Sequence, residues 1–497
     1  MEEVVFATAT GLAERIRRRE VSAVEVLDAY LARIERHNPR LNAVVTLDAE
    51  RARDRARMAD AALARGEVWG PLHGVPITVK DGLATAGLRT TSGNPAWADF
   101  VPDTDAPAVA RLKAAGAVVH GKTNLAFWSW DLHHSDNPVF GRTRNPWDPD
   151  CGAGGSSGGG AAAVAAGFAP LELATDGAGS ARVPPQHCGV CGLKPSESRV
   201  PWAGNHPSPA PVPAGAVRQQ PFTVGAIARS VEDLALALSL IAGPDRAHLE
   251  VPPVPLEPLP DLSVRRMRLA WTDQLGDAVV NADARRALAR LAADLGAAGA
   301  TVARAAPDGF DLAEACEAYG GLVWTRVAAG LAPDREDELL AILWGPPDEE
   351  DPFTRGAVRA RQATLDSYRQ VLLRRDALIL ALERFFDDWD AWLCPVSVAL
   401  AVPPCPKGAR IAVDGRPVPY WLAGGAYTAP LNLTGHPAVV LPLARGGGAA
   451  GRGAARRQAL GRDAAAGHRA AGGRGHRAVS PPARPRRLTG APRALPW

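Results

Sequence analysis

Hydrophobic and polar positions near the N-terminus follow first the period of a helix and then that of a strand. After Ser22, apolar residues recur every three or four positions, and Glu25 completes a capping box with Ser22, which predicts a helix to about His37. Within residues 70–81, apolar residues instead alternate with other residues behind a glycine and a proline. This alternation predicts a strand that ends at Lys80.

The next segments repeat the order of strand and helix. Helical spacing over 105–115, closed by a glycine, precedes strand-forming residues at 117–120. A helix of small residues over 159–167 then precedes a short apolar strand at 170–175. Strands that alternate with helices in this way are typical of an α/β fold, and no internal repeat divides the chain.

The C-terminal half has a different pattern. Residues 262–303 predict a strand, a helix and a strand, and residues 310–390 are largely helical with acidic breaks at 333–352. Two short apolar runs, Ala391–Val396 and Ala438–Leu443, are candidates for buried strands. We therefore expect a single α/β/α domain with a helical insertion.

Composition and charge exclude several classes of protein. The 497 residues are 46% hydrophobic, so the chain can bury a core and is not disordered throughout. The formal net charge of +3 divides into about +11 over residues 445–497 and about −8 over the rest. An acidic body offers no basic surface for nucleic acid, and we expect no nucleic-acid partner.

The same sequence predicts a location for the protein. The N-terminus has no apolar run typical of a signal peptide, and the longest uncharged stretch, Cys151–Leu171, is too rich in glycine for a membrane helix. Six cysteines in so long a chain favour reduced thiols over a disulfide framework. We expect a cytoplasmic protein that does not bind a membrane.

Two short motifs imitate well-known binding sites. Gly116 to Thr123 match the pattern of a phosphate-binding loop, but a helix precedes the first glycine and strand formers follow it, so we expect part of a strand there. Cys188 and Cys191 are spaced like zinc ligands but lack a second pair, so we expect buried thiols. We predict neither a metal nor a cofactor.

Three other segments together carry the residue types that acyl transfer requires, namely a nucleophile, a base and backbone N–H donors for an oxyanion. Ser180 follows a Gly-x-Gly turn at a predicted helix start, so the N–H groups of residues 177–180 can form an anion-binding nest. Lys80 ends a buried strand, where loss of solvent can leave its amine neutral near pH 7. Residues 154–159, Gly-Gly-Ser-Ser-Gly-Gly, offer a hydroxyl that can pass a proton between them. Taken alone, each segment has a plainer interpretation, as a linker or as a surface lysine.

In this order the segments resemble the amidase signature family, and the resemblance extends from about residue 5 to residue 443. It implies one α/β/α domain around a large mixed central sheet, with a Ser-cisSer-Lys catalytic set. Ser180 is then the nucleophile that forms the acyl-enzyme, Ser156 the bridging serine after a cis peptide, and Lys80 the base. The resemblance also implies supporting roles for Ser157, Asp176 and Arg182, and an oxyanion hole at Gly177, Ala178 and Gly179.

The chain departs from the family pattern at several positions. Ala178 stands where the family usually has glycine, and an alanine forced to a positive φ costs about 1 kcal/mol. Gly160 stands where the family usually has serine. The acidic residue often found after the Thr-Asn pair is absent, and residues 125–130 bring aromatic side chains that can either line a pocket for an apolar acyl group or pack in the core.

Residues 445–497 form a tail rich in Arg, Ala and Gly, without the periodicity of the preceding domain over residues 1–444. A natural disordered basic tail is one interpretation. The other is a frameshift, because residues 449–463 written in GC-rich codons and shifted by one base can read Leu-Pro-Val-Gly-Val-Gln-Leu-Val-Gly-Arg-Arg-Trp-Gly-Glu. That reading resembles the terminal strand of the family. We therefore expect low order in the tail.

The function predicted from the sequence is hydrolysis of a carboxylic amide of small-molecule size to a carboxylate and ammonia or an amine. The sequence does not name the amide, and it is compatible with a homodimer without specifying one. The alternative enzyme is the glutaminase subunit of a tRNA-dependent amidotransferase, which shares the same catalytic set. The alternative outside catalysis is an inactive, frameshifted product of an amidase gene.

Overall fold

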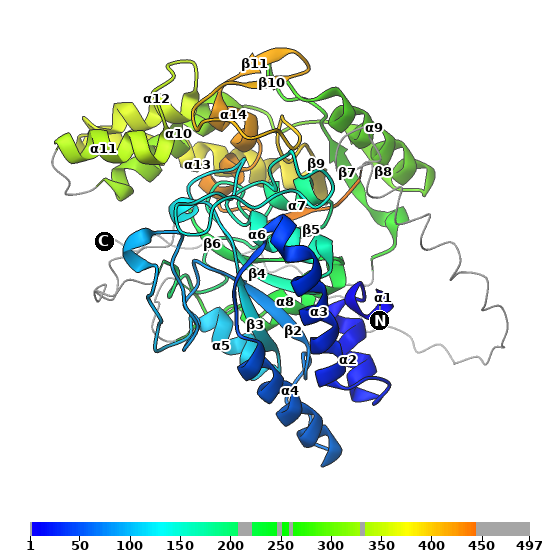
Figure 1. Cartoon of the computed structure of the whole chain (residues 1–497). Helices are drawn as coiled ribbons and strands as arrows, with labels where there is room; N and C mark the ends of the chain where they lie inside the picture. The colour runs from blue at the N-terminus through cyan, green and yellow to red at the C-terminus, as the bar shows by residue number, and fades with distance from the viewer. Residues whose placement is uncertain (1, 207–220, 246–250, 258–261, 329–332, 444–497) are drawn as a thin grey trace, which may run out of the picture. The chain divides into compact units, whose positions relative to one another are not determined.

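A computed structural model describes residues 2–206, 221–245, 251–257, 262–328 and 333–443. All of them belong to one compact unit within residues 1–455 (Figure 1). The predicted tail, 445–497, lies outside the described residues, so its boundary and its frameshift stay predictions.

Seven strands form one mixed sheet, which confirms the predicted α/β class. Strand β2 pairs in parallel with both of its neighbours, β3 and β4, and the other pairs are antiparallel. In spatial order the strands are β1 (Val44–Leu47), β3 (Val118–Thr123), β2 (Pro76–Lys80), β4 (Leu171–Asp176), β6 (Thr223–Ala228), β5 (Cys191–Lys194) and β12 (Ala438–Val440).

The N-terminal helices arise where the sequence predicts them. The capping box of Ser22 and Glu25 is formed, and its helix, α3, continues past the predicted end at His37 to Leu41. The helices that surround the sheet are α1 (Glu2–Val5), α2 (Ala9–Arg17), α3 (Ala23–Leu41), α4 (Ala49–Ala64), α5 (Pro107–Ala114), α6 (Gly158–Ala166), α7 (Val183–Cys188) and α8 (Val231–Ile241).

The two faces of the sheet differ in chemistry. Because side chains alternate along a strand, Ile77 and Val79 of β2 enter the apolar core that α3, α4, α5 and α8 cover. Thr78 and Lys80 point to the other face, which α6 covers. The apolar face therefore anchors β2 and β4, while the α6 face can carry polar chemistry.

The C-terminal half adds a second core and a second sheet. Strands β8 (Thr301–Arg304), β7 (Arg268–Trp271) and β9 (Ala391–Leu393) form a separate parallel sheet, and β10 (Ile411–Val413) pairs with β11 (Arg416–Val418). The helices of this half are α9 (Ala282–Ala297), α10 (Leu312–Val327), α11 (Pro333–Trp344), α12 (Pro352–Ala360), α13 (Leu365–Asp388), α14 (Tyr420–Gly425) and α15 (Ala429–Leu433).

Three expectations for this half were wrong in detail. The acidic segment from residue 333 is helix α11 as far as Trp344, because Leu340, Leu343 and Trp344 are buried in the second core and stabilise it. The run at 391–396 supplies only the short strand β9, whose residues are half-buried rather than buried. The run at 438–443 likewise supplies only the short strand β12, in which Val439 is exposed.

The two imitating motifs also have the predicted structure. Strand β3 contains the apparent phosphate loop, and Lys122 in it is buried with its Nζ donating to the carbonyl of Leu83. Cys188 and Cys191 are buried free thiols. No group of three His, Cys, Asp or Glu side chains among the described residues is placed to hold a metal ion.

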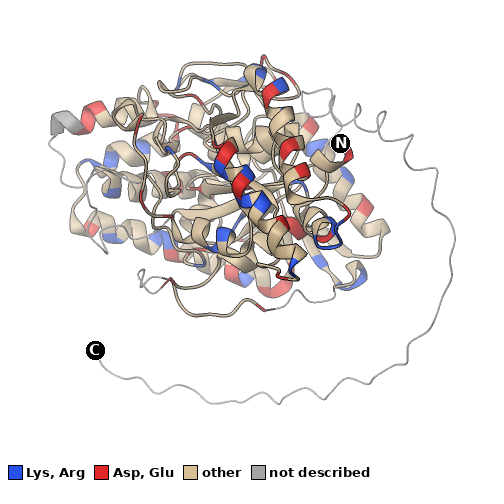
Figure 2. Ribbon diagram, turned by 60° about the horizontal axis from the view of Figure 1, so that its bottom comes forward, with Lys and Arg blue, Asp and Glu red and all other residues tan. Residues whose placement is uncertain are grey.

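Along several helices in Figure 2, positions of Lys and Arg are interspersed with positions of Asp and Glu. Within the described ranges, no helix is both long and apolar enough to span a membrane.

Candidate active site

Lys80 ends strand β2 with its whole side chain buried. Its Nζ donates hydrogen bonds to Ser156 Oγ at 2.7 Å and to Thr175 Oγ1 at 2.8 Å. Burial lowers the pKa of Lys80 to about 7, although the negative charges of Asp176 and Glu172 act in the opposite direction. A large fraction of the amine is therefore neutral near pH 7 and can accept a proton.

Ser156 lies in the loop before α6, and the peptide bond between Gly155 and Ser156 is cis. The Ser156 carbonyl accepts the Ala126 N–H at 3.2 Å and the Ser135 hydroxyl at 3.0 Å, so the loop is fixed on both sides. Ser157 follows as a buried residue whose hydroxyl donates to the Thr175 carbonyl at 3.4 Å. The loop thus presents the Ser156 hydroxyl to Lys80.

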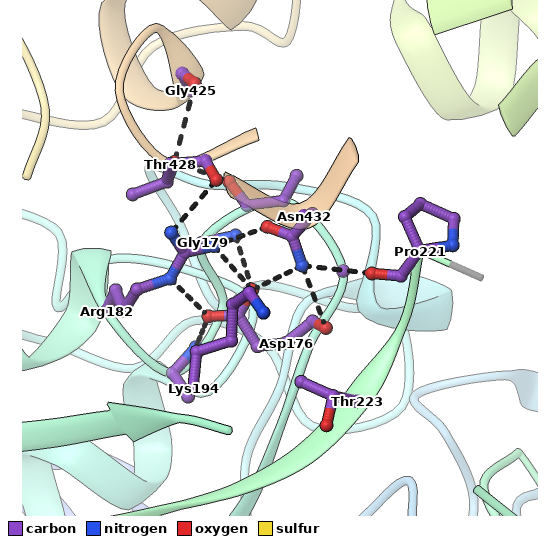
Figure 3. A network of polar contacts seen from close by, with 12 residues as sticks. Asp176, Gly179, Arg182, Lys194, Pro221, Thr223, Gly425, Thr428 and Asn432 are labelled. Carbon is purple, nitrogen blue, oxygen red and sulfur yellow. Dashed lines mark hydrogen bonds and ion pairs between the residues drawn. The ribbon is translucent and has the colours of Figure 1, made fainter. Parts of the chain in front are cut away.

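Asp176 and Arg182 form a buried ion pair at the end of β4 (Figure 3). Arg182 Nε donates to Asp176 Oδ2 at 2.9 Å and Nη2 donates to Oδ1 at 2.8 Å, which makes the pair bidentate. Burial alone would raise the pKa of Asp176, but the Arg182 charge and hydrogen bonds lower it to about 2. The carboxylate is therefore ionised throughout the neutral range.

Helix α15 and the residue before it complete this network. Arg182 Nη1 donates to the Thr428 carbonyl at 2.9 Å, and Nη2 also donates to Asn432 Oδ1. Asn432 Nδ2 donates to Asp176 Oδ1 at 3.1 Å and to the Pro221 carbonyl at 3.0 Å. Two segments more than 200 residues apart in sequence are thereby joined around one carboxylate.

The turn after β4 is folded onto the Asp176 carboxylate. The Gly179 N–H donates to Oδ1 at 2.9 Å and the Ala181 N–H donates to Oδ2 at 3.0 Å. Because the Gly179 amide already has an acceptor, we expect it not to serve as a donor in the predicted oxyanion hole. Gly179 contributes its conformation instead, because its φ of 133° is one that other residues rarely adopt.

Ser180 is 5% exposed, and neither its hydroxyl nor its N–H has a partner among the described residues. The N–H groups of Gly177 and Ala178 are equally without an acceptor there. The carbonyls of the same two residues are held, because the Tyr319 hydroxyl donates to Gly177 at 2.7 Å and the Thr428 hydroxyl donates to Ala178. The Gly177 carbonyl shares its peptide group with the available Ala178 N–H, so the Tyr319 bond fixes the orientation of that donor. The Ala178 carbonyl shares its peptide group with the Gly179 N–H, which is already bound to Asp176.

Ala178 does not have the strained conformation expected from the sequence. It is not among the described non-glycine residues with a positive φ, so the predicted cost of alanine at this position was wrong. The unusual dihedral falls on Gly179, where an added Cβ would lie 2.6 Å from Thr428 Oγ1.

The structure brings Lys80 and Ser156 into direct contact and joins Asp176 to Arg182, while Ser180 makes no hydrogen bond to Ser156. Sequence reasoning missed Thr428, which holds both the Ala178 carbonyl and the Arg182 guanidinium. It assigned no role to Asn432, although this residue lies in a segment that resembles the family. A lone threonine more than 200 residues away gives no local signal.

The sequence left two interpretations open for residues 125–130 after β3, a pocket lining or packing in the core. Leu125 is buried in the core, and Trp130 packs edge-on against Trp344 with ring centroids 5.8 Å apart. Trp128 is 39% exposed and stacks on His206 at 6.0 Å. Core packing therefore accounts for part of this segment, and Trp128 remains open to solvent.

Comparison with known proteins assigns the chain to a family. The model of the Amidase family matches residues 25–449. A glutamyl-tRNA(Gln) amidotransferase subunit from Moorella thermoacetica is 34% identical over 465 residues, which cover 88% of this chain and 90% of that protein. Indoleacetamide hydrolase of Bradyrhizobium diazoefficiens is 33% identical over 442 residues, which cover 88% of this chain and 80% of that protein.

A solved structure supports the same assignment. A bacterial aryl acylamidase of the amidase signature family superimposes with a TM-score of 0.74 at 26% identity, over 88% of this chain and 90% of the other. The predicted family and enzyme class are thus confirmed. The chain belongs to the amidase signature family and is an enzyme of the amidase class.

Proposed function

We propose that this protein hydrolyses a carboxylic amide through an acyl-enzyme on Ser180, with Ser156 and Lys80 as a proton relay. Ser180 Oγ attacks the amide carbon while its proton passes to Ser156 Oγ, and the proton of Ser156 passes to Lys80 Nζ. The relay then runs backwards and delivers a proton to the leaving nitrogen as the C–N bond breaks. Water hydrolyses the resulting ester and restores Ser180.

The N–H groups of Gly177, Ala178 and Ser180 are the proposed donors to the oxyanion. They have no other acceptor among the described residues, and preorganised donors of this kind stabilise the charge that develops in the transition state. Asp176 and Arg182 are proposed as supports, because their ion pair fixes the turn that carries Ser180. Ser157 is proposed as a support of the Ser156 loop.

The observation that carries the proposal is the 2.7 Å contact between Lys80 Nζ and Ser156 Oγ in a fully buried site. A buried amine whose pKa lies near 7 has the protonation state that a general base requires at neutral pH. A lysine kept only for structure would gain more from an ion pair than from two neutral hydroxyl groups.

The test is covalent capture by a serine-directed phosphonate combined with a hydrolysis screen over aryl, alkyl and amino-acid amides. Ser180→Ala should abolish both labelling and turnover. Ser239→Ala is the matched control, because Ser239 is an exposed serine of α8 whose hydroxyl only donates to the Leu236 carbonyl. Undiminished labelling of Ser180→Ala would refute the nucleophile.

A glutaminase subunit of an amidotransferase is the second candidate, and the 34% identity to such a subunit favours it. Against it, Ser180 is followed by Ala-Arg-Val-Pro, where these glutaminase subunits typically have Ile-Arg-Gln-Pro. Residues 1–444 also carry a formal charge of about −8, which offers no face for RNA. Release of ammonia from glutamine only in the presence of partner subunits would favour this candidate. Turnover of simple amides by the isolated chain would favour the amidase.

A further inference from the structure

A second carboxylate lies beside Lys80 on the same face of the sheet. Glu172 in β4 is in register with Thr78 in β2, and Lys80 follows Thr78 by two residues, so all three point to the face that α6 covers. The Glu172 side chain is completely buried. Burial of an ionised carboxylate costs free energy unless a nearby positive charge compensates it.

The hydrogen bonds of Glu172 do not neutralise it. Its Oε1 accepts the Thr123 hydroxyl at 2.6 Å, and its Oε2 is buried without a hydrogen-bond partner. Asp176, the other carboxylate that acts on Lys80, is already bound by Arg182 in a bidentate ion pair. Glu172 is therefore the carboxylate near Lys80 that no ion pair among the described residues binds.

Helix α6 leaves space for this side chain. A Cβ built at Gly160 would lie 2.6 Å from both Cγ and Oε1 of Glu172, so any larger residue at 160 would collide with the carboxylate. Gly160 is a position at which the sequence departs from its family, and Glu172 occupies the volume that the departure frees. Gly160 and Glu172 therefore fit together, because the missing side chain at 160 makes room for the glutamate.

The charged groups around Glu172 are few. Strand β2 contributes Lys80, and β3 contributes Lys122, whose Nζ is engaged by the Leu83 carbonyl and by two threonine hydroxyls. His120, the other titratable residue of β3, bonds to the Phe168 carbonyl. Strand β6 and helix α6 contain no titratable residue.

We propose that Glu172 is a positioning residue that supplies the counter-charge for the ammonium form of Lys80 whenever Lys80 holds the proton of Ser156. This inference rests on the proposed proton relay. When the proton moves from Ser156 Oγ to Lys80 Nζ, the new positive charge forms among fully buried side chains, and the Glu172 carboxylate stabilises it there. No proton passes to Glu172, and the ammonium returns its proton toward the leaving nitrogen.

The same geometry sets the direction of the pKa changes. Burial lowers the pKa of Lys80, and the Glu172 charge opposes that effect. Burial raises the pKa of Glu172 to about 7, so the two groups titrate in the same range and influence each other. Removal of the Glu172 charge must therefore lower the pKa of Lys80 further.

The experiment follows the ionisation of Lys80 directly by NMR of the full chain labelled with [13Cε]lysine. The chain has only five lysines, and the Lys80 signal is assigned by its loss in Lys80→Met. In Glu172→Gln, which keeps the shape and an acceptor for Thr123, the Lys80 midpoint should fall by about one pH unit. Asp54→Asn, which removes an exposed acid of α4, should leave the midpoint unchanged. An unchanged or raised midpoint in Glu172→Gln overturns the proposal.

Two further measurements separate this role from simple packing. A merely structural role would change the melting temperature of Glu172→Gln without moving the Lys80 midpoint. If this variant does not fold, the wild-type signal decides, because coupling to a group that titrates in the same range broadens the Lys80 titration, and a single step of ordinary width refutes the coupling. Turnover is not needed for either readout, so failure of the amidase proposal, shown by an active Ser180→Ala, is distinguishable from failure of this one.

Discussion

Arg182 binds the Asp176 carboxylate through two hydrogen bonds of 2.8 and 2.9 Å, and the same carboxylate accepts the N–H groups of Gly179 and Ala181. The ion pair therefore determines the shape of the turn that carries Ser180. An anion placed at this turn cannot use the Gly179 amide, since Asp176 already does. We therefore expect the proposed oxyanion donors among the neighbouring peptide groups.

Arg182→Met should destabilise the protein by about 3–5 kcal/mol, because it leaves the buried Asp176 charge without a partner. Arg57→Met, which removes an exposed partner of Asp54, should leave the unfolding midpoint nearly unchanged. Urea denaturation of both variants measures the difference. Equal midpoints for Arg182→Met and the wild type would show that the pair does not hold the turn.

The loss of stability in Arg182→Met should depend on pH. The pKa of Asp176 in the folded protein, about 2, is below its ordinary value, so the pair contributes stability at pH above about 4. That contribution is lost as pH falls toward 2. The deficit of Arg182→Met should therefore be largest near neutral pH and shrink below pH 4.

Lys80→Met should lower kcat by several orders of magnitude and keep the fold. In the wild type, kcat/KM should rise with pH through about 7 and level off above it, because the neutral amine is the base. The residual rate of the variant should lack this rise. A variant with near-normal kcat, or a wild-type profile that falls through pH 7, would contradict the assignment of the base.

The structure does not show the strain that the sequence predicts at Ala178, and this determines what Ala178→Gly should do. Since Ala178 has no positive φ, glycine relieves no strain there, and kcat should not increase. The added freedom of the glycine backbone should lower stability by about 0.5–1 kcal/mol. Steady-state kinetics and denaturation of this variant test both statements, and a raised kcat at constant KM would mean that the turn needs a glycine at 178.

Much of the central fold could be predicted because its signals are local. The alternation that ends at Lys80, the small residues of α6 and the cap at Ser22 each act within a few residues, and each element formed close to its predicted bounds. Helix α11 was not predicted, because its acidic residues are typical of a break. Its stability comes from Leu340 and Trp344, which pack against distant parts of the chain.

The sequence proposes the residues of the candidate site but not the geometry in which they lie. Motifs identify Lys80, Ser156 and Ser180, but they do not reveal which backbone N–H groups remain free. That depends on Asp176 turning back onto its own loop and on Thr428, which comes from far along the chain. Such contacts are tertiary and have no local sequence signal.

The last strand of the main sheet bears on the predicted frameshift. Among the described strands, β12 pairs only with β5, so its other edge has no partner. Beside it lies a groove of about 660 Å³, lined in part by Phe386, Trp389 and Leu443. Val439 and Leu441 of the same region are 50% and 44% exposed. An open edge next to exposed apolar residues favours aggregation.

Restoring the frame by one base near codons 444–449 should therefore give a more soluble and more active enzyme. The shifted reading, Val-Gly-Val-Gln-Leu-Val, alternates as a strand does and can supply the backbone donors and acceptors that the free edge of β12 lacks. Soluble yield, melting temperature and amide turnover of the two versions measure the effect, with a version ending at Leu443 as the control. If the frame-restored chain did not exceed that control in soluble yield, melting temperature or turnover, the groove would not be the place of a missing strand. Resequencing of the gene tests the origin independently, and a clean read in the present frame together with a protease-resistant segment at 450–497 would make the frameshift wrong.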